Sequence, residues 1–600
     1  MINEEQSSGL ISPIFTNKIK SEDCEKAFSI LQKYKSAKST LESRMINDEE
    51  WFRLHNWDHR AKPNEEIQPK SGWLVNAILN KHADAMDAIP TADVLPREEN
   101  DKEEAENLSS ILPVILDNNG FENVYSELWF DKLKSGTGVY GIFWDSSKLD
   151  GKGDITIECI DILNLFWEPG VKNIQDSQNV FYASLVDNNI LLRKYPELKN
   201  KLGQSGFVNE YVHDESIDTS AKSLVVDWYY KVSENGKDIL HYCKFCNNVV
   251  LFSTENDEKM SQSGLYDHGK YPFIFDKLYP IKDSICGFGY IDLGRSPQEY
   301  IDRIDKAILE NTLYGSVPRY FMNKSGTVNE DDFLDFNKHI VYVEGANLGA
   351  DSVRNIETKS LPGGIFNVKA DKVEELKEVT GNRDVSTGGT TSGVTAASAI
   401  AAMQESGSKL SRDAIKGSYN AYKEVCLLCI ELIRQFYDTV RTFRIIGQEK
   451  EMQFINYTNA GIVPQPQGEI DPITGKPQEY GIEVGYRLPV FDVKVTAEKT
   501  SPYTKLSQNE LALQFYNQGF FNPQIADQAL ACLEMMDFEG KEQVIKRIEA
   551  SQSNFIVNML NSMAPPAVPQ SEKPELNREE EESAVTAKAR ENARNSTVPN

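Results

Sequence analysis

A very long helical pattern, which runs from about Thr395 to Phe443, constrains the fold of this chain more than any other feature. At 1.5 Å per residue the helix would extend for roughly 70 Å, which is far longer than the helices of ordinary globular domains. Its first turns, Ala396–Met403, consist mostly of small residues that allow close packing against neighbours, and Gly407 and Gly417 are expected kink sites. The pattern therefore indicates a spine shared between packed subunits, in a protein that assembles.

Two amphipathic helical patterns come before the long helix and bracket a strand-rich insert. The first follows Ser296–Glu299, which has the capping-box spacing with proline at the first helical position, and Pro318 ends it. The second, Val368–Val379, has Gly381 as a natural C-terminal stop. A Gly/Thr/Ser loop then leads into the long helix, and its residues are Gly388, Gly389, Thr390, Thr391, Ser392 and Gly393.

The chain before this region predicts an α+β body. Helical patterns cover residues from Glu25 to about Trp57 and Trp73–Met86, and proline residues end both. Glycine-punctuated strand patterns then run from Gly136 to Phe252, with a hairpin turn at Glu234–Lys237. The mixture of helical and strand periods places this body in the α+β class.

The chain after Phe443 changes character twice. Short strand patterns flank a Pro/Gly-rich excursion, Gly461–Gly481, and helical patterns return from Ser507 to Leu560. The final stretch, Ala564–Asn600, is rich in Pro, Glu, Ala and Asn and has few large apolar residues. Such a composition cannot bury enough apolar surface to fold, so we expect a disordered tail.

The chain is strongly acidic: its 600 residues include 91 Asp+Glu and 64 Lys+Arg, which gives a formal net charge of −27. Tight, general DNA binding is therefore not expected, because phosphate contacts from basic residues dominate such affinity. An acidic surface could still surround DNA without holding it, and the alternative is that the excess only keeps the chain soluble. The sequence shows no signal segment and no apolar run of about 18 residues, so we expect a soluble protein without a membrane partner.

The sequence motifs point away from catalysis and metal binding. Two Cys-x-x-Cys spacings, Cys243/Cys246 and Cys426/Cys429, lack a third and fourth ligand at metal spacing. Cys243 and Cys246 would fall on opposite faces of a strand, and the second pair lies on an apolar helical surface. The glycine-rich segment 136–141 lacks the lysine of a phosphate-binding loop, and no Gly-x-Ser-x-Gly turn is present. We predict no catalytic residues, no metal and no cofactor.

The order of these elements resembles the core of the portal proteins (head-tail connectors) of tailed double-stranded DNA bacteriophages. The segment most similar to that family is Gly388–Ile400, followed by Gln404–Gly407. The resemblance spans residues 25–560 in layout and depends on the order of elements, because the family has no invariant catalytic motif. It implies a portal-like multi-domain subunit of class α+β, with an α/β wing, a two-helix stem, a small α/β clip, a long spine helix and a C-terminal helical crown.

The resemblance also divides the chain into the parts of such a subunit. In chain order they are an N-terminal arm (1–24), a wing body (25–284), stem helix 1 (285–317), a clip (318–366), stem helix 2 (367–383), a tunnel loop (384–396), a long wing helix (397–443), wing strands (444–500), crown helices (501–562) and a disordered tail (563–600).

The family resemblance implies a structural protein without enzymatic activity. Portal subunits form a ring, usually of twelve copies, at one capsid vertex, and double-stranded DNA passes through its centre during packaging and ejection. The implied partners are further copies of the chain, the terminase large subunit, a head-tail adaptor protein, and the major capsid and scaffolding proteins. The implied location is the virion, with assembly in the host cytoplasm. The chain lacks Gly-x-x-x-x-Gly-Lys-[Ser/Thr], which agrees with a lack of ATPase activity.

Four basic residues are candidates for transient contacts with DNA in the channel: Lys369, Lys372 and Lys377 on the second stem helix, and Arg383 near the tunnel loop. The alternative for each is a solvent-facing or inter-subunit salt bridge. The glycines of the tunnel loop, Gly388–Gly393, permit movement. For the whole chain, the alternatives are a different ring or adaptor protein of the virion, or a hydrolytic enzyme that uses Asp and Glu.

Overall fold

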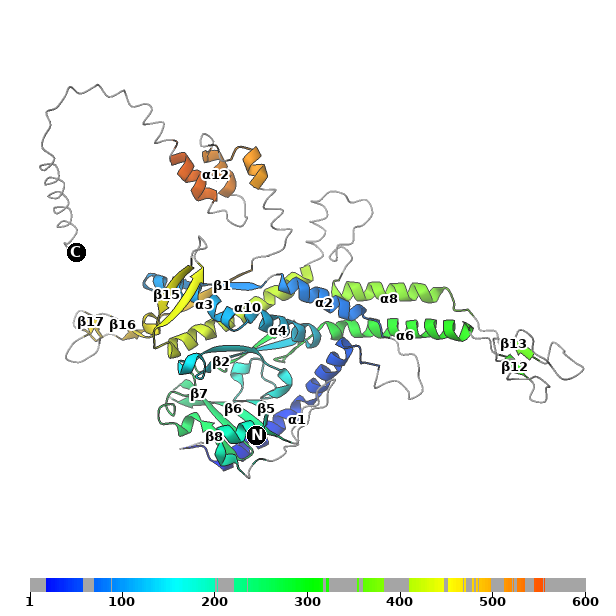
Figure 1. The fold of residues 1–600 in the computed structure, drawn as a ribbon, viewed down its shortest axis with the longest axis horizontal. Helices are drawn as coiled ribbons and strands as arrows, with labels where there is room; N and C mark the ends of the chain where they lie inside the picture. Colours follow the sequence, from blue (N-terminus) through cyan, green and yellow to red (C-terminus); the bar gives the residue numbers. More distant parts are fainter. Residues whose placement is uncertain are drawn as a thin grey trace, which may run out of the picture. The chain divides into compact units, whose positions relative to one another are not determined.

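The computed structural model divides into two compact units, Met1–Lys499 and Thr500–Asn600. The residues that it describes are 18–57, 70–87, 89–199, 202, 221–234, 236–316, 320–322, 353–355, 360–382, 409–446, 452–467, 469–470, 477–479, 482–483, 485–497, 512–520, 522, 526–534, 544–553 and 555. Helices and strands are mixed within the first unit, which confirms the expected α+β composition (Figure 1).

The described helices are mainly amphipathic, and they bury apolar side chains against other elements of their own unit. They are α1 (Ser21–Phe52), α2 (Trp73–Met86), α3 (Lys102–Asn118), α4 (Phe121–Ser135), α5 (Asn188–Lys194), α6 (Tyr290–Ser316), α8 (Gly364–Thr380), α10 (Lys409–Phe436) and α12 (Ala526–Glu534). The boundaries of α2 agree with the predicted helix. Within the described part of the chain, none of these helices has the length and apolar content needed to cross a membrane.

The described strands form small antiparallel sheets. They are β1 (Pro90–Pro96), β2 (Thr137–Asp145), β3 (Asp154–Cys159), β4 (Leu165–Trp167), β5 (Asn179–Asp187), β6 (Lys222–Glu234), β7 (Lys237–Cys246), β8 (Val249–Ser253), β9 (Phe273–Lys277), β10 (Tyr279–Pro280), β11 (Gly287–Phe288), β12 (Tyr320–Met322), β13 (Val353–Asn355), β14 (Arg441–Ile446), β15 (Met452–Tyr457), β16 (Gln465–Pro466), β17 (Glu469–Ile470), β18 (Pro477–Glu479), β19 (Ile482–Glu483), β20 (Tyr486–Arg487) and β21 (Phe491–Ala497). The pairing of β1 with β21 joins two segments of the first unit that lie far apart in the sequence.

A five-stranded antiparallel sheet, in the order β4-β5-β6-β7-β8, forms one layer of the first unit. β6 and β7 are joined by a two-residue hairpin in which Glu234 pairs with Lys237, and Gly236 has a φ of 79°, a conformation that tight hairpin turns favour. The predicted hairpin turn is therefore confirmed.

The central strand β6 is buried on both faces. Val226 and Trp228 belong to the apolar cluster that contains α1 residues, whereas Val225 belongs to a cluster on the opposite face. The same alternation along β7 places Cys243 with α1 and Cys246 on the other side. The prediction that these two cysteines lie on opposite faces of a strand is therefore confirmed.

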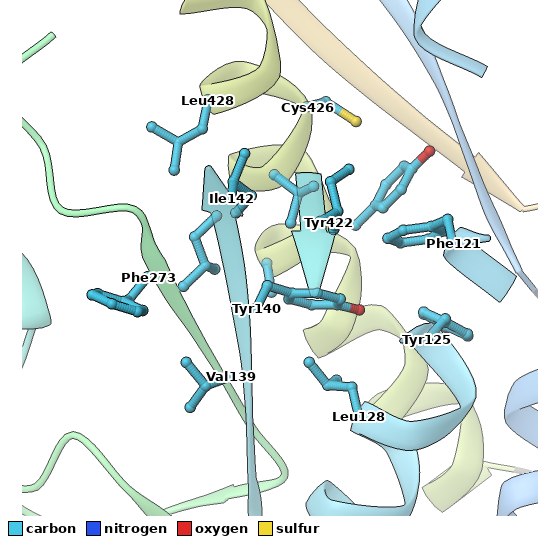
Figure 2. Close-up of a cluster of buried hydrophobic side chains, with 14 of the residues drawn as sticks. Phe121, Tyr125, Leu128, Val139, Tyr140, Ile142, Phe273, Tyr422, Cys426 and Leu428 are labelled. Carbon is cyan, nitrogen blue, oxygen red and sulfur yellow. The ribbon is translucent and has the colours of Figure 1, made fainter. Parts of the chain in front are cut away.

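The main core lies between α4, the three-stranded sheet β3-β2-β9 and α10 (Figure 2). The Phe121 ring of α4 lies 6.1 Å from Tyr140 of β2 and 5.4 Å from Tyr422 of α10, measured between centroids. Cys426 and Leu428 of α10 lie in the same cluster. Burial of apolar area on this scale, at roughly 25 cal/mol per Å², is the main stabilising contribution to the unit.

The helix α10 ends at Phe436, and the prediction that it continues to Phe443 is wrong. Residues Arg441–Ile446 form β14 instead, which pairs with β15, and the Arg441 guanidinium donates hydrogen bonds to carbonyl groups of the loop before β3. These pairings outweigh continuation of a helix through the β-branched residues Thr439 and Val440. Over Lys409–Phe436 the apolar stripe is covered by its own chain, so the helix is a core element there.

The helix α6 begins at Tyr290, upstream of the predicted capping box at Ser296, and Pro297 lies inside it. The cause is an earlier cap: the Gly289 N–H donates to Asp292 Oδ2 at 3.2 Å, so Asp292 satisfies the helix end from its third position. The helix α8 ends at Thr380, and Gly381 follows in the left-handed conformation, with a φ of 63°. The predicted glycine stop is therefore confirmed.

The second unit, Thr500–Asn600, contains a small helical cluster in its described part. α12 packs with helical residues 512–517 and 544–553 through Phe515, Leu533 and Ile548. These helices fall within the predicted crown (501–562). The predicted tail (563–600), the predicted tunnel loop (384–396), most of the predicted N-terminal arm (1–24) and most of the predicted clip (318–366) lie outside the described residues.

Candidate functional site

The helices α6 and α8 pack side by side as an antiparallel pair, which we call the helix pair (Figure 1). Lys369 Nζ lies 2.5 Å from Asp305 Oδ1, and Lys372 Nζ lies 5.4 Å from the centre of the Tyr300 ring. Residue numbers thus rise along α8 while they fall along α6, as an antiparallel register requires. The chain passes from one helix to the other through β12 and β13, which pair antiparallel.

Three helices meet at the base of the helix pair, where α6 has a glycine. A Cβ atom on Gly294 would lie 2.4 Å from Leu74 Cδ1 of α2 and 3.5 Å from Leu376 Cδ1 of α8. The first distance is far below van der Waals contact, and both leucines are buried. Only glycine therefore lets α2 approach α6 this closely without a shift of Leu74.

Two polar side chains of α6 hold the start of α2. Asp302 accepts hydrogen bonds from Trp57 Nε1 at 3.1 Å and from the Ser71 N–H at 3.2 Å. Gln298 Oε1 accepts from the Leu74 N–H at 3.1 Å, which satisfies one of the amide groups that a helix start leaves unpaired. Desolvation raises the pKa of the Asp302 carboxyl, although hydrogen bonds from Ser71, Trp57 and Gln298 oppose the shift.

A buried lysine on α2 connects the end of α8 with the start of α10. Lys81 Nζ donates to the carbonyl group of Gly381 at 3.1 Å and to Ser411 Oγ at 2.9 Å. Ser411 Oγ donates in turn to Asp84 Oδ2 at 2.8 Å. Lys81 is 4% exposed, and desolvation lowers its pKa, while the Asp84 carboxylate opposes that shift. The ammonium group is therefore solvated mainly by these protein oxygens.

Neighbouring contacts reinforce this junction. Asn80 Nδ2 donates to Asn382 Oδ1 at 3.3 Å, and the hydroxyl group of the buried Thr380 donates to the Leu376 carbonyl at 2.8 Å. Because one ammonium group contacts both, Gly381 O and Ser411 Oγ lie no farther apart than the two hydrogen bonds end to end, about 6 Å. The described residues that flank the segment 383–408 are thus close together and held on α2.

The helix α1 contacts α6 through a buried carboxylate. Asp48 Oδ1 accepts from Arg295 Nη2 at 2.6 Å, whereas Asp48 Oδ2 is buried with no hydrogen-bond partner among the described residues. Burial raises the pKa of Asp48 to about 7, and the Asp292 carboxylate adds to this effect, while Arg295 and Arg44 oppose it. Desolvation outweighs the ion pair because one carboxylate oxygen has lost water without a replacement.

The raised pKa of Asp48 predicts that the folded chain loses stability as pH rises. Between pH 3.8 and about 7 the folded chain retains a proton on Asp48 that the unfolded chain has released. The contribution of this proton to folding stability is therefore complete below pH 3.8 and is lost as pH rises through 7. Asp48→Asn is therefore expected to gain stability relative to wild type from pH 4 to pH 7, by up to about 4 kcal/mol.

Denaturant unfolding at the two pH values measures this change in Asp48→Asn. A suitable control is Asp145→Asn, because a hydrogen bond from Ser147 lowers the pKa of the Asp145 carboxyl. That variant should show no gain over the same interval. A pH-independent difference between wild type and Asp48→Asn would contradict the assignment.

Two of the four basic candidates already have acidic partners. Lys369 pairs with Asp305 across the helix pair, and Lys372 pairs with Glu375, one turn along α8, at 2.5 Å. The helix pair carries nine acidic and six basic residues, so both lysines sit in a net acidic surrounding. Such pairs exposed to solvent contribute little to stability and can exchange partners readily.

The other candidates are placed less completely. Lys377 is partly buried in the last turn of α8. Arg383 and the loop residues Gly388–Gly393 lie outside the described residues, although the chain on either side, Gly381 and Ser411, is described. The structure therefore brings Lys369, Lys372 and Lys377 onto one helix that ends at the base of the predicted loop.

A second cluster of titratable groups lines a cavity of about 250 Å³ between α1, α4 and residues 161–163. Lys134 Nζ lies 2.5 Å from Glu49 Oε2 and 3.5 Å from Asp131 Oδ1. Desolvation raises the pKa of Asp131, and it raises the pKa of Asp161 to about 6. Within the described ranges, no group of three or more His, Cys, Asp and Glu side chains is arranged to hold a metal ion. A structural ion-pair cluster accounts for these contacts.

Comparison with models of known protein families assigns the chain to a family. The family model of the phage P22-like portal protein matches residues 69–596, which is far more than half of the sequence. The chain belongs to this family. No curated protein matches it. The resemblance to phage portal proteins is therefore confirmed, and the chain is a structural protein of a bacteriophage virion, a component of its capsid.

Sequence reasoning missed Lys81 in this portal protein. Lys81 follows Ala77 and Ile78 by four and three positions, so it lies on the buried stripe of α2. A lysine on such a stripe is rarely buried without a polar partner, and this signal could have drawn attention to it. Its partners, Gly381 and Ser411, lie 300 and 330 residues away in the sequence, so no local pattern could have predicted them.

Proposed function

We propose that the chain forms the portal ring at one vertex of the capsid, with a central channel through which double-stranded DNA is packaged and ejected. Twelve copies are proposed from the family resemblance. In this assignment α6 and α8 are the two stem helices, β12 and β13 belong to the clip, residues 384–396 are the tunnel loop, and the helices of the second unit are the crown. Family membership supports the proposal.

The same proposal gives the ring its partners. The clip would dock the terminase large subunit during packaging and a head-tail adaptor protein afterwards, while the wing and crown would meet the major capsid and scaffolding proteins. Assembly would take place in the host cytoplasm. These partners follow from the family resemblance, and no enzymatic role is required of the chain.

Apolar side chains that lie exposed on the helix pair support the proposed ring. Leu309 and Leu313 lie one turn apart on one side of α6 and are 47% and 46% exposed. Val368 and Val379 lie three turns apart on one side of α8 and are also exposed. Exposed apolar stripes of this kind mark protein interfaces. Further copies of the same helix pair would cover them in a closed ring.

The acidic helix pair also suits a channel wall past which DNA moves. Like charges prevent phosphate from adhering, while individual basic side chains that exchange their partners allow brief contacts. We propose Lys369, Lys372, Lys377 and Arg383 as these contacts. For Lys369 and Lys372 this requires exchange of Asp305 and Glu375 for phosphate, which exposed ion pairs permit.

Imaging of the purified protein tests the ring. We expect negative-stain micrographs of wild type to show rings with a central hole, and we expect Leu309→Asp/Leu313→Asp to remain monomeric, because charges would face the covered surface. A matched control is Ile190→Asp on α5, whose side chain is 59% exposed. This control should leave the ring intact.

Thermal unfolding separates loss of the interface from loss of the fold, because both variants should unfold as wild type does when compared as monomers. A monodisperse wild-type monomer under assembly conditions would overturn the proposed ring. If Leu309→Asp/Leu313→Asp still forms rings, this side of α6 does not lie in the interface between subunits.

A further inference from the structure

We propose that Lys81 is a positioning residue that holds the two residues on either side of the segment 383–408, Gly381 and Ser411, on α2, and through α2 on the helix pair. Its consequence for DNA rests on the proposed function, because that segment contains the proposed tunnel loop. The positioning itself depends only on contacts among described residues. It assigns a role to a buried lysine that the ring and its channel do not otherwise explain.

The Lys81 ammonium group contacts the chain on both sides of the segment 383–408. Lys81 Nζ reaches Gly381 O, the residue after α8, and Ser411 Oγ, in the first turn of α10, within ordinary hydrogen-bond distance of both. Hydrogen bonds from a charged donor are stronger than neutral ones, and burial prevents water from replacing them. One side chain thus contacts both flanks of the segment 383–408, Gly381 before it and Ser411 after it.

The contacts of Lys81 differ from those of another buried lysine of the same chain. Lys38 of α1 is also buried, and its Nζ donates to the carbonyl groups of Ile162 and Leu165. Those two acceptors belong to one short stretch of chain, so Lys38 stabilises a local turn. Lys81 instead joins two helices that no described stretch of chain connects directly.

The helix α2 connects these contacts to the helix pair. Its start is held by Gln298 and Asp302 of α6, and Leu74 packs closely on Gly294 of the same helix. Its last turns hold Gly381 and Ser411 through Lys81, and Asn80 adds a hydrogen bond to Asn382. A displacement of either end of the segment 383–408 must therefore move α2 against the helix pair or break the Lys81 contacts.

Hydrogen exchange measured by mass spectrometry tests the positioning role. In Lys81→Met, exchange of the amides at residues 378–382 and 411–416 is expected to rise about tenfold or more, because local opening no longer has to break the shared contacts. The control Lys38→Met removes another buried lysine and should leave exchange at both stretches as in wild type. Wild-type exchange at both stretches in Lys81→Met would overturn the proposal, as would an equal rise in Lys38→Met.

A second variant keeps the proposal testable if Lys81→Met does not fold. Ser411→Ala removes one acceptor of the ammonium group and retains the other, so exchange should rise at 411–416 and stay near wild type at 378–382. Unchanged exchange at 411–416 would overturn the proposal.

The exchange result does not depend on whether rings form, so failure of the ring in wild type would count against the proposed function alone. If rings form, imaging and packaging assays on Lys81→Met complete the test. We expect intact rings with reduced DNA packaging, and wild-type packaging despite increased exchange would overturn the link to DNA.

Discussion

Replacing Lys132 with methionine is expected to lower the stability of the first unit by about 3–5 kcal/mol, the usual cost of removing one partner from a buried ion pair. Lys132 of α4 is fully buried, and its Nζ lies 2.8 Å from Asp276 Oδ1 of β9. Ser418 of α10 completes the group: its Oγ accepts from Lys132 and donates to Asp276 Oδ2 at 2.5 Å. The three residues therefore join α10 to α4 and to the sheet.

The size of the effect follows from what remains after the substitution. Methionine has nearly the volume of lysine, so packing is preserved and the loss reports the charge. Asp276 is 2% exposed and would retain only the hydrogen bond from Ser418 against the cost of a buried carboxylate. Removal of both partners in Lys132→Met/Asp276→Leu should recover much of the stability, because no charge is then left unpaired.

Denaturant unfolding followed by tryptophan fluorescence measures this loss, since Lys132 Nζ lies 4.4 Å from the centre of the Trp129 ring. The matched control is Lys172→Met, because Lys172 pairs with Asp283 at 2.7 Å but both side chains are more than half exposed. That variant should change stability by less than about 1 kcal/mol. Equal losses of stability in Lys132→Met and Lys172→Met would show that the buried ion pair contributes no more to stability than the exposed one.

The parts of the fold that were predicted correctly have local causes. The helix α2, the hairpin between β6 and β7 and the stop at Gly381 each depend on residues within a few positions: the apolar stripe of Trp73–Met86, the glycine at 236, and a glycine after the last turn of α8. Such signals are present in the sequence itself, since the backbone conformation that they favour needs no distant partner.

The two helix boundaries that were predicted wrongly have different causes, one distant and one local. The end of α10 is decided by Arg441, whose guanidinium finds the carbonyl groups of Lys152 and Gly153 almost 300 positions earlier in the chain. The start of α6 shows a different cause, because two capping signals compete and the first, Asp292, is used. Tertiary contacts override propensity in the first case, and a choice between equivalent local signals decides the second.

The candidate site divides in the same way. Sequence pattern alone placed Lys369, Lys372 and Lys377 on one helix, because the apolar residues between them recur at helical spacing. It could not give their partners, since the pairing of Lys369 with Asp305 is a consequence of the antiparallel register of α6 and α8. Lys81 lies on the apolar stripe of α2, and only the folded chain shows the oxygen atoms that accept hydrogen bonds from its ammonium group.

Deletion of the six loop residues Gly388–Gly393 is expected to leave the ring intact and to abolish DNA packaging. The fold should persist because Lys81 holds Gly381 O and Ser411 Oγ, on either side of the segment 383–408, within about 6 Å of each other. A shorter connection between two nearby points costs slightly less closure entropy, so the helices on either side keep their places. Packaging should fail if these residues meet the DNA, as the proposed function requires.

The control deletes six residues from a segment that the proposed function does not place in the channel, residues 209–214 between α5 and β6. Both deletion variants should form rings in negative-stain images and show the same hydrogen exchange at 378–382 and 411–416 as wild type, which separates the role of the loop from that of Lys81. Packaged DNA per particle, measured by nuclease protection, should fall only in the Gly388–Gly393 deletion. Normal packaging in that variant would remove these residues from the DNA path, whereas loss of the ring in it would place them in subunit assembly.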